Sequence, residues 1–181
     1  MAPAADGARL IPSLRIFLSS PGDVEEERRI TRELIDQLPK HPFLRGRVAL
    51  QLVAWDDPAA PIPLRANESP QESVNAFRPR PADCDIVIVI LWSRMGTPTP
   101  LPDRKPDGTP FTGTEWEYHN AVSSSRQPKP QVLVYRRTQP PPIEPEDPER
   151  EEKESHHEAV QAFIEGVRAQ QRGTNDYWDA A

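Results

Sequence analysis

The sequence predicts a three-layer α/β fold, in which helices cover both faces of a parallel sheet. The first observation is the segment 85–92, where six consecutive aliphatic residues lie between Asp85 and Trp92. Most of the six are β-branched, which favours a strand. The run does not alternate with polar residues, so both faces of this strand are expected to be buried. The second observation is that short apolar runs alternate with amphipathic segments, which predicts right-handed β-α-β crossovers.

The elements follow from apolar periodicity and from turn residues. The turn 19–23 contains Pro21 and Gly22 and ends the first strand. The helix after it has an apolar stripe that includes Leu34 and Leu38. Ser69 is expected as the N-cap of a second helix. In chain order, we expect strands at residues 14–18, 48–55, 85–92 and 132–135 and helices at 23–38, 69–77, 114–126 and 155–171.

This element order predicts a flavodoxin-like sheet of four or five strands in the order 2-1-3-4(-5). In that order, the switch point lies between the first and third strands, and open α/β sheets bind ligands at such points. The chain leaves these two strands through residues 19–23 and 92–96. The ligand site is therefore expected where these two segments meet.

The remaining segments have few apolar residues. Residues 1–13 are expected to be a disordered lead-in to one domain over 14–181. The loop 96–113 is too polar to be expected to pack, and it is long for a connection between a strand and a helix. Residues 139–153 form a Pro-rich and acidic insertion without core residues.

Composition argues against several classes of protein. The formal net charge of −6 and the absence of a basic stripe argue against a nucleic-acid surface. The single cysteine, Cys84, cannot form an intrachain disulfide, and no secretory segment opens the chain, so a cytoplasmic location is expected. No run is long enough to span a membrane. His156 and His157 are adjacent on a helix and point apart, so no metal is expected.

Three motifs resemble a known family. They lie at residues 15–24, 88–98 and 113–118, and they resemble a TIR-like domain family found at the N-terminus of multidomain signalling NTPases of the STAND type, often with NACHT and repeat modules. The resemblance covers most of 14–181. It implies an effector domain of an immune, antiphage-defence or cell-death system that self-associates. It also implies C-terminal ATPase and sensor modules as partners, which this chain does not contain.

The resemblance also implies an activity. The broader TIR group contains enzymes that cleave NAD⁺ at the bond between nicotinamide and ribose, with NAD⁺ as substrate and no prosthetic group. Their catalytic Glu lies early in the helix after the third strand, followed by an apolar residue and by Ala four positions on. Glu117 matches this pattern through Tyr118 and Ala121, whereas Glu115, the second choice, has His119 four positions on. The product is either ADP-ribose or a cyclic variant.

The chemistry of this reaction fits a single carboxylate. Nicotinamide is already a cationic leaving group, so the enzyme has to stabilise positive charge that develops on the ribose. Backbone N–H groups at the start of the first helix are an expected anion cradle, and Arg94 is expected to pair with the pyrophosphate. Trp92 and Trp116 are candidates for stacking. The expected binding residues are Ser19, Ser20, Gly22, Asp23, Trp92, Ser93 and Arg94.

Structural roles are open for the same residues. If Thr114 is the N-cap of its helix, Glu117 completes a capping box; if Thr112 is the N-cap, Glu115 does so. The two Trp side chains also fit a core, where Trp is found more often than at a ligand. Ser19 and Asp23 fit a turn and a helix cap, and Arg94 fits a solvated surface.

Two further functions therefore stand beside NAD⁺ cleavage. One is a non-enzymatic module that acts by self-association or as an adaptor, since a fold does not determine chemistry. The other is an enzyme similar to nucleoside deoxyribosyltransferases, which share the sheet type and place a Glu at a sugar carbon.

Overall fold

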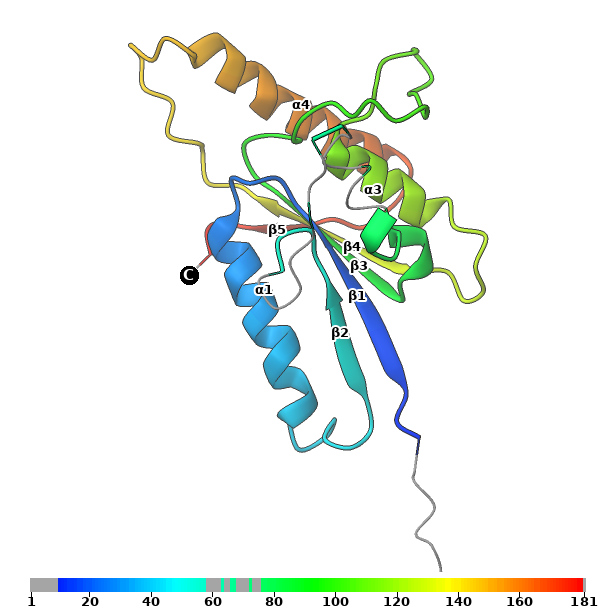
Figure 1. The fold of residues 1–181 in the computed structure, drawn as a ribbon. Helices are drawn as coiled ribbons and strands as arrows, with labels where there is room; N and C mark the ends of the chain where they lie inside the picture. Colours follow the sequence, from blue (N-terminus) through cyan, green and yellow to red (C-terminus); the bar gives the residue numbers. More distant parts are fainter. Residues whose placement is uncertain (1–9, 58–62, 64–65, 68–71, 73–75, 181) are drawn as a thin grey trace, which may run out of the picture.

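The computed structural model describes residues 10–57, 63, 66, 67, 72 and 76–180, and these contain a five-stranded sheet in which all neighbouring strands are parallel. The strand order is β2-β1-β3-β4-β5 (Figure 1). This arrangement confirms the predicted fold class and strand order. The strands are β1 (Ser13–Ser19), β2 (Ala49–Val53), β3 (Ile86–Leu91), β4 (Gln131–Arg137) and β5 (Asn175–Tyr177).

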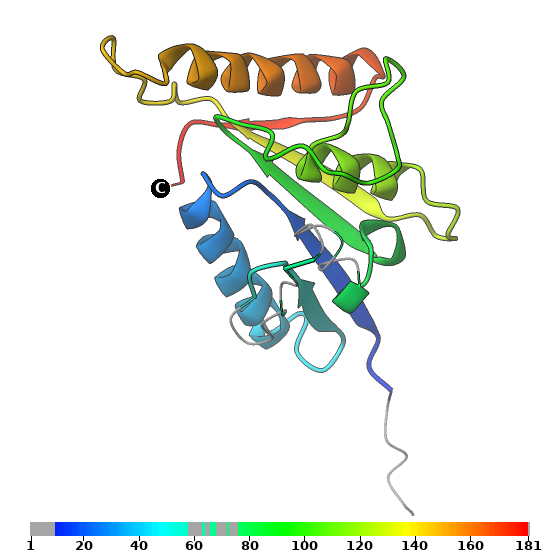
Figure 2. The ribbon, with the colours of Figure 1, turned by 45° about the horizontal axis from the view of Figure 1, so that its top comes forward.

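Helices cover both faces of the sheet. In the described part of the chain, α1 (Glu25–Gln37) lies on one side, and α3 (Gly113–Val122) and α4 (Arg150–Ala169) lie on the other (Figure 2). Short 3₁₀ helices occupy Leu38–Lys40 and Pro81–Asp83. Glu72 and Phe77 of the expected second helix are helical, whereas Ser69, its expected N-cap, lies outside the described residues.

The central strand is buried on both faces, as its uniform apolar run predicts. Val87, Val89 and Leu91 belong to the core that includes α3 and α4. Ile90, with the partly buried Ile88, belongs to the core on the α1 side. Because β1 and β4 flank β3 on its two edges, its backbone groups also find partners within the sheet.

Helix α4 begins at Arg150, whereas the sequence led us to expect a start at Ser155. The end of the predicted insertion 139–153 is therefore helical. Asp147 explains the early start, because its carboxylate accepts hydrogen bonds from the Glu149 backbone N–H at 2.8 Å and from Lys153 Nζ at 2.7 Å. The Asp147 carboxylate thus fixes the backbone at the start of α4, where its negative charge also interacts favourably with the helix dipole.

The loop 96–113 packs, contrary to the prediction from its polar composition. Leu101 and Phe111 are buried against Trp116 of α3 and form a small separate core. Antiparallel bridges join Pro98 to Thr112 and Arg104 to Pro110. A few apolar residues suffice here because the loop folds back on itself and places them together.

The predicted apolar stripe of α1 is buried only in part. Val24, just before the helix, and Ile35 are buried, but Leu34 is 55% exposed and Leu38 is 41% exposed. Periodicity predicted the stripe but not its limits, which depend on how α1 lies across the sheet. Leu34 and Leu38 belong to the predicted stripe but do not lie in the core.

Replacing Ile164 by Ala is expected to lower the free energy of unfolding by about 2–5 kcal/mol, because the side chain is fully buried between α4 and the sheet. The neighbouring Glu165 is exposed, so Glu165→Ala is the matched control and should change the same quantity by about 0.5 kcal/mol or less. Urea unfolding followed by circular dichroism measures both. Equal effects of the two substitutions would contradict this packing of α4.

Candidate functional site

A buried hydrogen bond joins the end of β1 to α3. Ser19 Oγ donates to Glu117 Oε2 at 2.6 Å, and the two residues are 0% and 5% exposed. Ser19 is the last residue of β1, and Glu117 lies in the first half of α3. The predicted carboxylate is thus turned toward the carboxyl edge of the sheet, at the strand-order switch between β1 and β3.

The start of α3 decides between the two capping alternatives. Thr112 is the N-cap, and its side chain accepts a hydrogen bond from the Glu115 backbone N–H. In return, Glu115 Oε2 accepts from the Thr112 backbone N–H at 2.9 Å, and Glu115 also pairs with Lys105 Nζ at 2.8 Å. Glu115 is therefore the capping acid. The cap does not involve Glu117, and the alternative in which Thr114 caps the helix was wrong.

Asp23 connects the segment after β1 to the segment after β3. Its Oδ2 accepts hydrogen bonds from the Ser93 backbone N–H at 2.9 Å and from Ser93 Oγ at 2.8 Å. The N-cap position of α1 belongs to Val24, which makes no side-chain capping bond. The alternative that Asp23 is a helix cap is therefore wrong. The segments 19–23 and 92–96, which we call the exits of β1 and β3, do meet as predicted.

The other predicted binding residues of these exits differ in exposure. Ser20 is buried, and within the described residues its Oγ has no hydrogen-bond partner. Arg94 is about half exposed, and its Nε lies 3.9 Å from Asp23 Oδ1. A Cβ added to Gly22 would lie 3.2 Å from an Arg94 guanidinium nitrogen, so the missing side chain leaves room for this cation.

The two candidate stacking residues lie in different places. Trp92 donates from Nε1 to the Gln139 carbonyl oxygen at 2.7 Å, and the Arg137 guanidinium lies 4.1 Å from its ring centre. Trp116 is buried in the small loop core and donates from Nε1 to Asp103 Oδ2 at 2.8 Å. Trp116 therefore has the core role that the sequence left open, and Trp92 remains at the predicted site.

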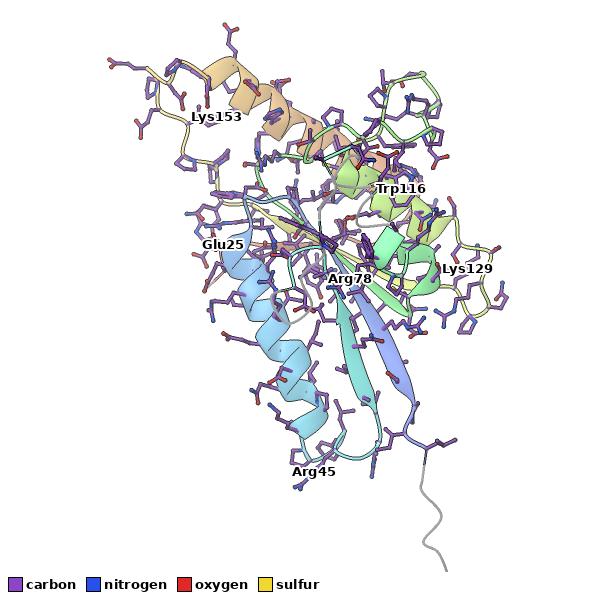
Figure 3. All side chains as sticks on the ribbon, viewed as in Figure 1. Glu25, Arg45, Arg78, Trp116, Lys129 and Lys153 are labelled. Carbon is purple, nitrogen blue, oxygen red and sulfur yellow. The ribbon has the colours of Figure 1, made fainter. Side chains whose placement is uncertain are left out.

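A cavity of about 390 Å³ lies against the two exits. Four predicted binding residues line it, namely Asp23, Trp92, Ser93 and Arg94. Its opposite wall comes from the segment after β4 and from the start of α4, near the labelled Lys153 (Figure 3). That wall consists of Pro141, Pro142, Ile143, Glu149, Glu152, Lys153 and His156.

Sequence reasoning missed this second wall. The insertion has no core residues, and composition alone marks such a segment as a linker. One signal was present: the segment follows β4 at the same edge of the sheet as the other two exits. Neither Glu117 nor the predicted binding residues Ser19, Ser20 and Gly22 line this cavity. The structure thus brings four of the predicted binding residues together, and it joins the carboxylate to Ser19, four residues before Asp23.

A second cavity, of about 610 Å³, lies along the outer side of α3. Trp116, His119 and Asn120 line it, together with Arg104 of the loop and Arg126 after the helix. Burial lowers the pKa of His119 below its usual value. Apart from Trp116, a candidate for stacking, none of the residues predicted to bind the substrate lines this cavity.

The described residues contain no group of three or more His, Cys, Asp or Glu side chains placed to hold a metal ion. His156 lines the first cavity, and its Nε2 lies 3.9 Å from Glu152 Oε1. This pair is not part of such a group. Among the helices formed by these residues, none has the length and apolar character needed to cross a bilayer.

Comparison with known proteins gives one family. A family model described as Domain of unknown function (DUF4062) matches residues 15–181, which is most of the chain. Neither the curated proteins nor the solved structures contain a match.

Replacing Thr112 or Glu115 by Ala is expected to lower the free energy of unfolding by about 0.5–2 kcal/mol, because each removes one of two reciprocal hydrogen bonds. The double variant should lose less than the sum of the two, since the first substitution already weakens the second bond. Urea unfolding of the four proteins measures this coupling. Strictly additive losses would show that the two residues do not cap α3 together.

Proposed function

We propose that this chain, which belongs to the DUF4062 family, cleaves NAD⁺ at the bond between nicotinamide and ribose, with Glu117 as the catalytic carboxylate. In this proposal it is an effector domain of an immune or cell-death system. The observation that carries the proposal is the position of Glu117, which is buried at the strand-order switch and bonded to Ser19 rather than used as a helix cap. Open α/β sheets bind their ligands at that point.

Cleavage of the bond between nicotinamide and ribose requires little more than a fixed negative charge. As the bond to nicotinamide breaks, positive charge develops on the ribose, and a carboxylate beside the sugar stabilises it. The bond from Ser19 restricts the orientation of Glu117, and a preorganised group does not have to reorient during the reaction. Nicotinamide leaves as a neutral molecule, so a proton donor is unnecessary. Water forms the new bond to the ribose carbon and releases one proton to the solvent.

The first cavity supports binding of one half of the dinucleotide. Its volume of about 390 Å³ is at the small end of ligand pockets and suits a nucleoside with one phosphate. Arg94 supplies a cation for phosphate, and Trp92 supplies an aromatic wall whose orientation is set by its bond to the Gln139 carbonyl. The other half of the substrate would extend past Ser19 toward Glu117.

This arrangement requires Ser19 to act as a positioning residue and the segment 19–23 to lie along the substrate. The resemblance to TIR-like domains suggests that clustering activates the domain. A test should therefore use the chain fused to an oligomeric scaffold as well as the chain by itself.

Incubation of the clustered chain with NAD⁺ is expected to release nicotinamide, measured by liquid chromatography. Glu117→Gln should lower the rate by about a hundredfold or more, because it removes the negative charge while keeping the shape of the side chain. Glu115→Gln is the matched control, since Gln also completes a capping box. It should keep most of the rate. Equal rates for the parent and the Glu117→Gln variant would overturn the proposal.

A second candidate function is self-association without catalysis. The observation that favours it is that three large apolar side chains close in the sequence, at the end of α1 and after it, are exposed, namely Leu34, Leu38 and Phe43, of which Phe43 is 73% exposed. We infer that they contribute to one interaction surface. Such a surface also fits the clustering that the enzymatic proposal needs.

Replacing Leu34 and Phe43 by Ser is expected to shift the chain toward monomer in sedimentation experiments at micromolar concentration. Ile11→Ser is the control, because Ile11 is also exposed but lies at the N-terminal end of the described chain. If the double variant and the parent sediment alike, this surface does not mediate self-association. Loss of assembly with retained nicotinamide release would separate the two functions.

A further inference from the structure

The Asp23 carboxylate uses only one of its two oxygens within the fold. Oδ2 accepts both hydrogen bonds from Ser93, which fix the plane and the direction of the carboxylate. Oδ1 is buried and has no hydrogen-bond partner among the described residues. The side chain as a whole is 13% exposed. A buried carboxylate oxygen without a donor is costly, so an acceptor held in this way is suited to a donor supplied by a ligand.

The surroundings of Oδ1 indicate the class of ligand. Asp23 lines the first cavity beside Arg94, whose Nε lies 3.9 Å from Oδ1, which is too far for a hydrogen bond. Arg94 is an ion-pair partner of Asp23, but its side chain is about half exposed, so the guanidinium can also meet an anion in the cavity. An acceptor for a hydroxyl next to a cation for a phosphate matches a ribose 5′-phosphate, in which both groups lie on one sugar.

We propose that Asp23 is the specificity-determining residue of this cavity, accepting a hydrogen bond from a ribose hydroxyl so that the cavity binds nucleotides with a free 2′-hydroxyl and rejects 2′-phosphorylated ones. The inference rests on the proposed function and deepens it, because it assigns NAD⁺ rather than its 2′-phosphorylated form as the substrate. A 2′-phosphate would place a second negative charge against the carboxylate and would remove the donor.

The rest of the cavity adds to this rejection. Glu149 and Glu152 add two further carboxylates to the opposite wall. The cation on that wall, Lys153, already pairs with Asp147 at 2.7 Å and with Glu149 at 3.3 Å. Arg94 is thus the cation best placed for one phosphate, and the second phosphate of a 2′,5′-bisphosphate meets acidic side chains.

Calorimetric titration of the whole chain with three ligands tests the proposal. Adenosine 5′-monophosphate should bind at least about tenfold more tightly than 2′-deoxyadenosine 5′-monophosphate, because a hydrogen bond to a charged acceptor is lost. Adenosine 2′,5′-bisphosphate should bind more weakly still. Equal affinities for the three ligands, or no binding of any of them, would overturn the assignment of Asp23.

Asp23→Asn is the decisive variant. The Asn side-chain oxygen can still accept the bonds from Ser93, while its amide group replaces the free acceptor with a donor. The preference for the 2′-hydroxyl over 2′-phosphate should then fall about tenfold or more. Glu151→Gln removes one charge from an exposed position of α4 that does not line the cavity, and it is the matched control, which should keep the preference. Retention of the full preference by Asp23→Asn would contradict the proposal.

Circular dichroism shows whether Asp23→Asn folds. If it does not, the affinities of the parent chain for the three ligands still test the proposal. These titrations require no turnover, so they report on Asp23 independently of NAD⁺ cleavage. If the chain ranks the ligands as expected but releases no nicotinamide, the proposed role of Asp23 stands and the proposed role of Glu117 is wrong.

Discussion

The hydrogen bond between Ser19 and Glu117 is the constraint on which the rest of the candidate site depends. It joins residues 98 positions apart in sequence and lies where water is excluded. A buried carboxylate destabilises a fold unless hydrogen bonds or charges compensate it, so its partner must be placed reliably. That placement comes from the sheet, because β1 pairs with β3 along Ile16–Ser19 and α3 packs over both strands. The carboxylate is therefore positioned by the most buried part of the protein.

The short segment after β1 connects this buried pair to the solvent-accessible cavity. Ser19 contacts α3, whereas Asp23 contacts the segment after β3 through Ser93. Gly22 lies between them and leaves room for the Arg94 guanidinium. This segment therefore contacts Glu117 of α3 at one end, through Ser19, and presents the Asp23 carboxylate at the other. In the proposed function, an extended substrate with two sugars would lie along it.

The sequence contained most of the information about the sheet and less about the cavity. The uniform apolar run of β3 predicted a doubly covered strand, because burial on both faces leaves no place for polar residues. The exposure of Leu34 and the burial of Leu101 and Phe111 were not predicted, since they depend on how α1 and the loop 96–113 lie against other elements. The cavity wall formed by residues between Pro141 and His156 was not predicted for the same reason. It depends on where the chain after β4 lies relative to the other elements, and no local sequence pattern encodes that position.

The choice between Glu115 and Glu117 shows how a loop can decide chemistry on a helix. Two residues apart on an α-helix, side chains point about 200° from each other, so one acid faces the cap and the other faces the sheet. Which acid does which depends on the residue where α3 begins. The loop fixes that residue: Thr99 donates to the Phe111 carbonyl at 2.8 Å, and Gly113 donates to the Thr97 carbonyl at 3.1 Å. These bonds hold Thr112 extended as the N-cap, and a start two residues later would give Glu117 the capping role instead.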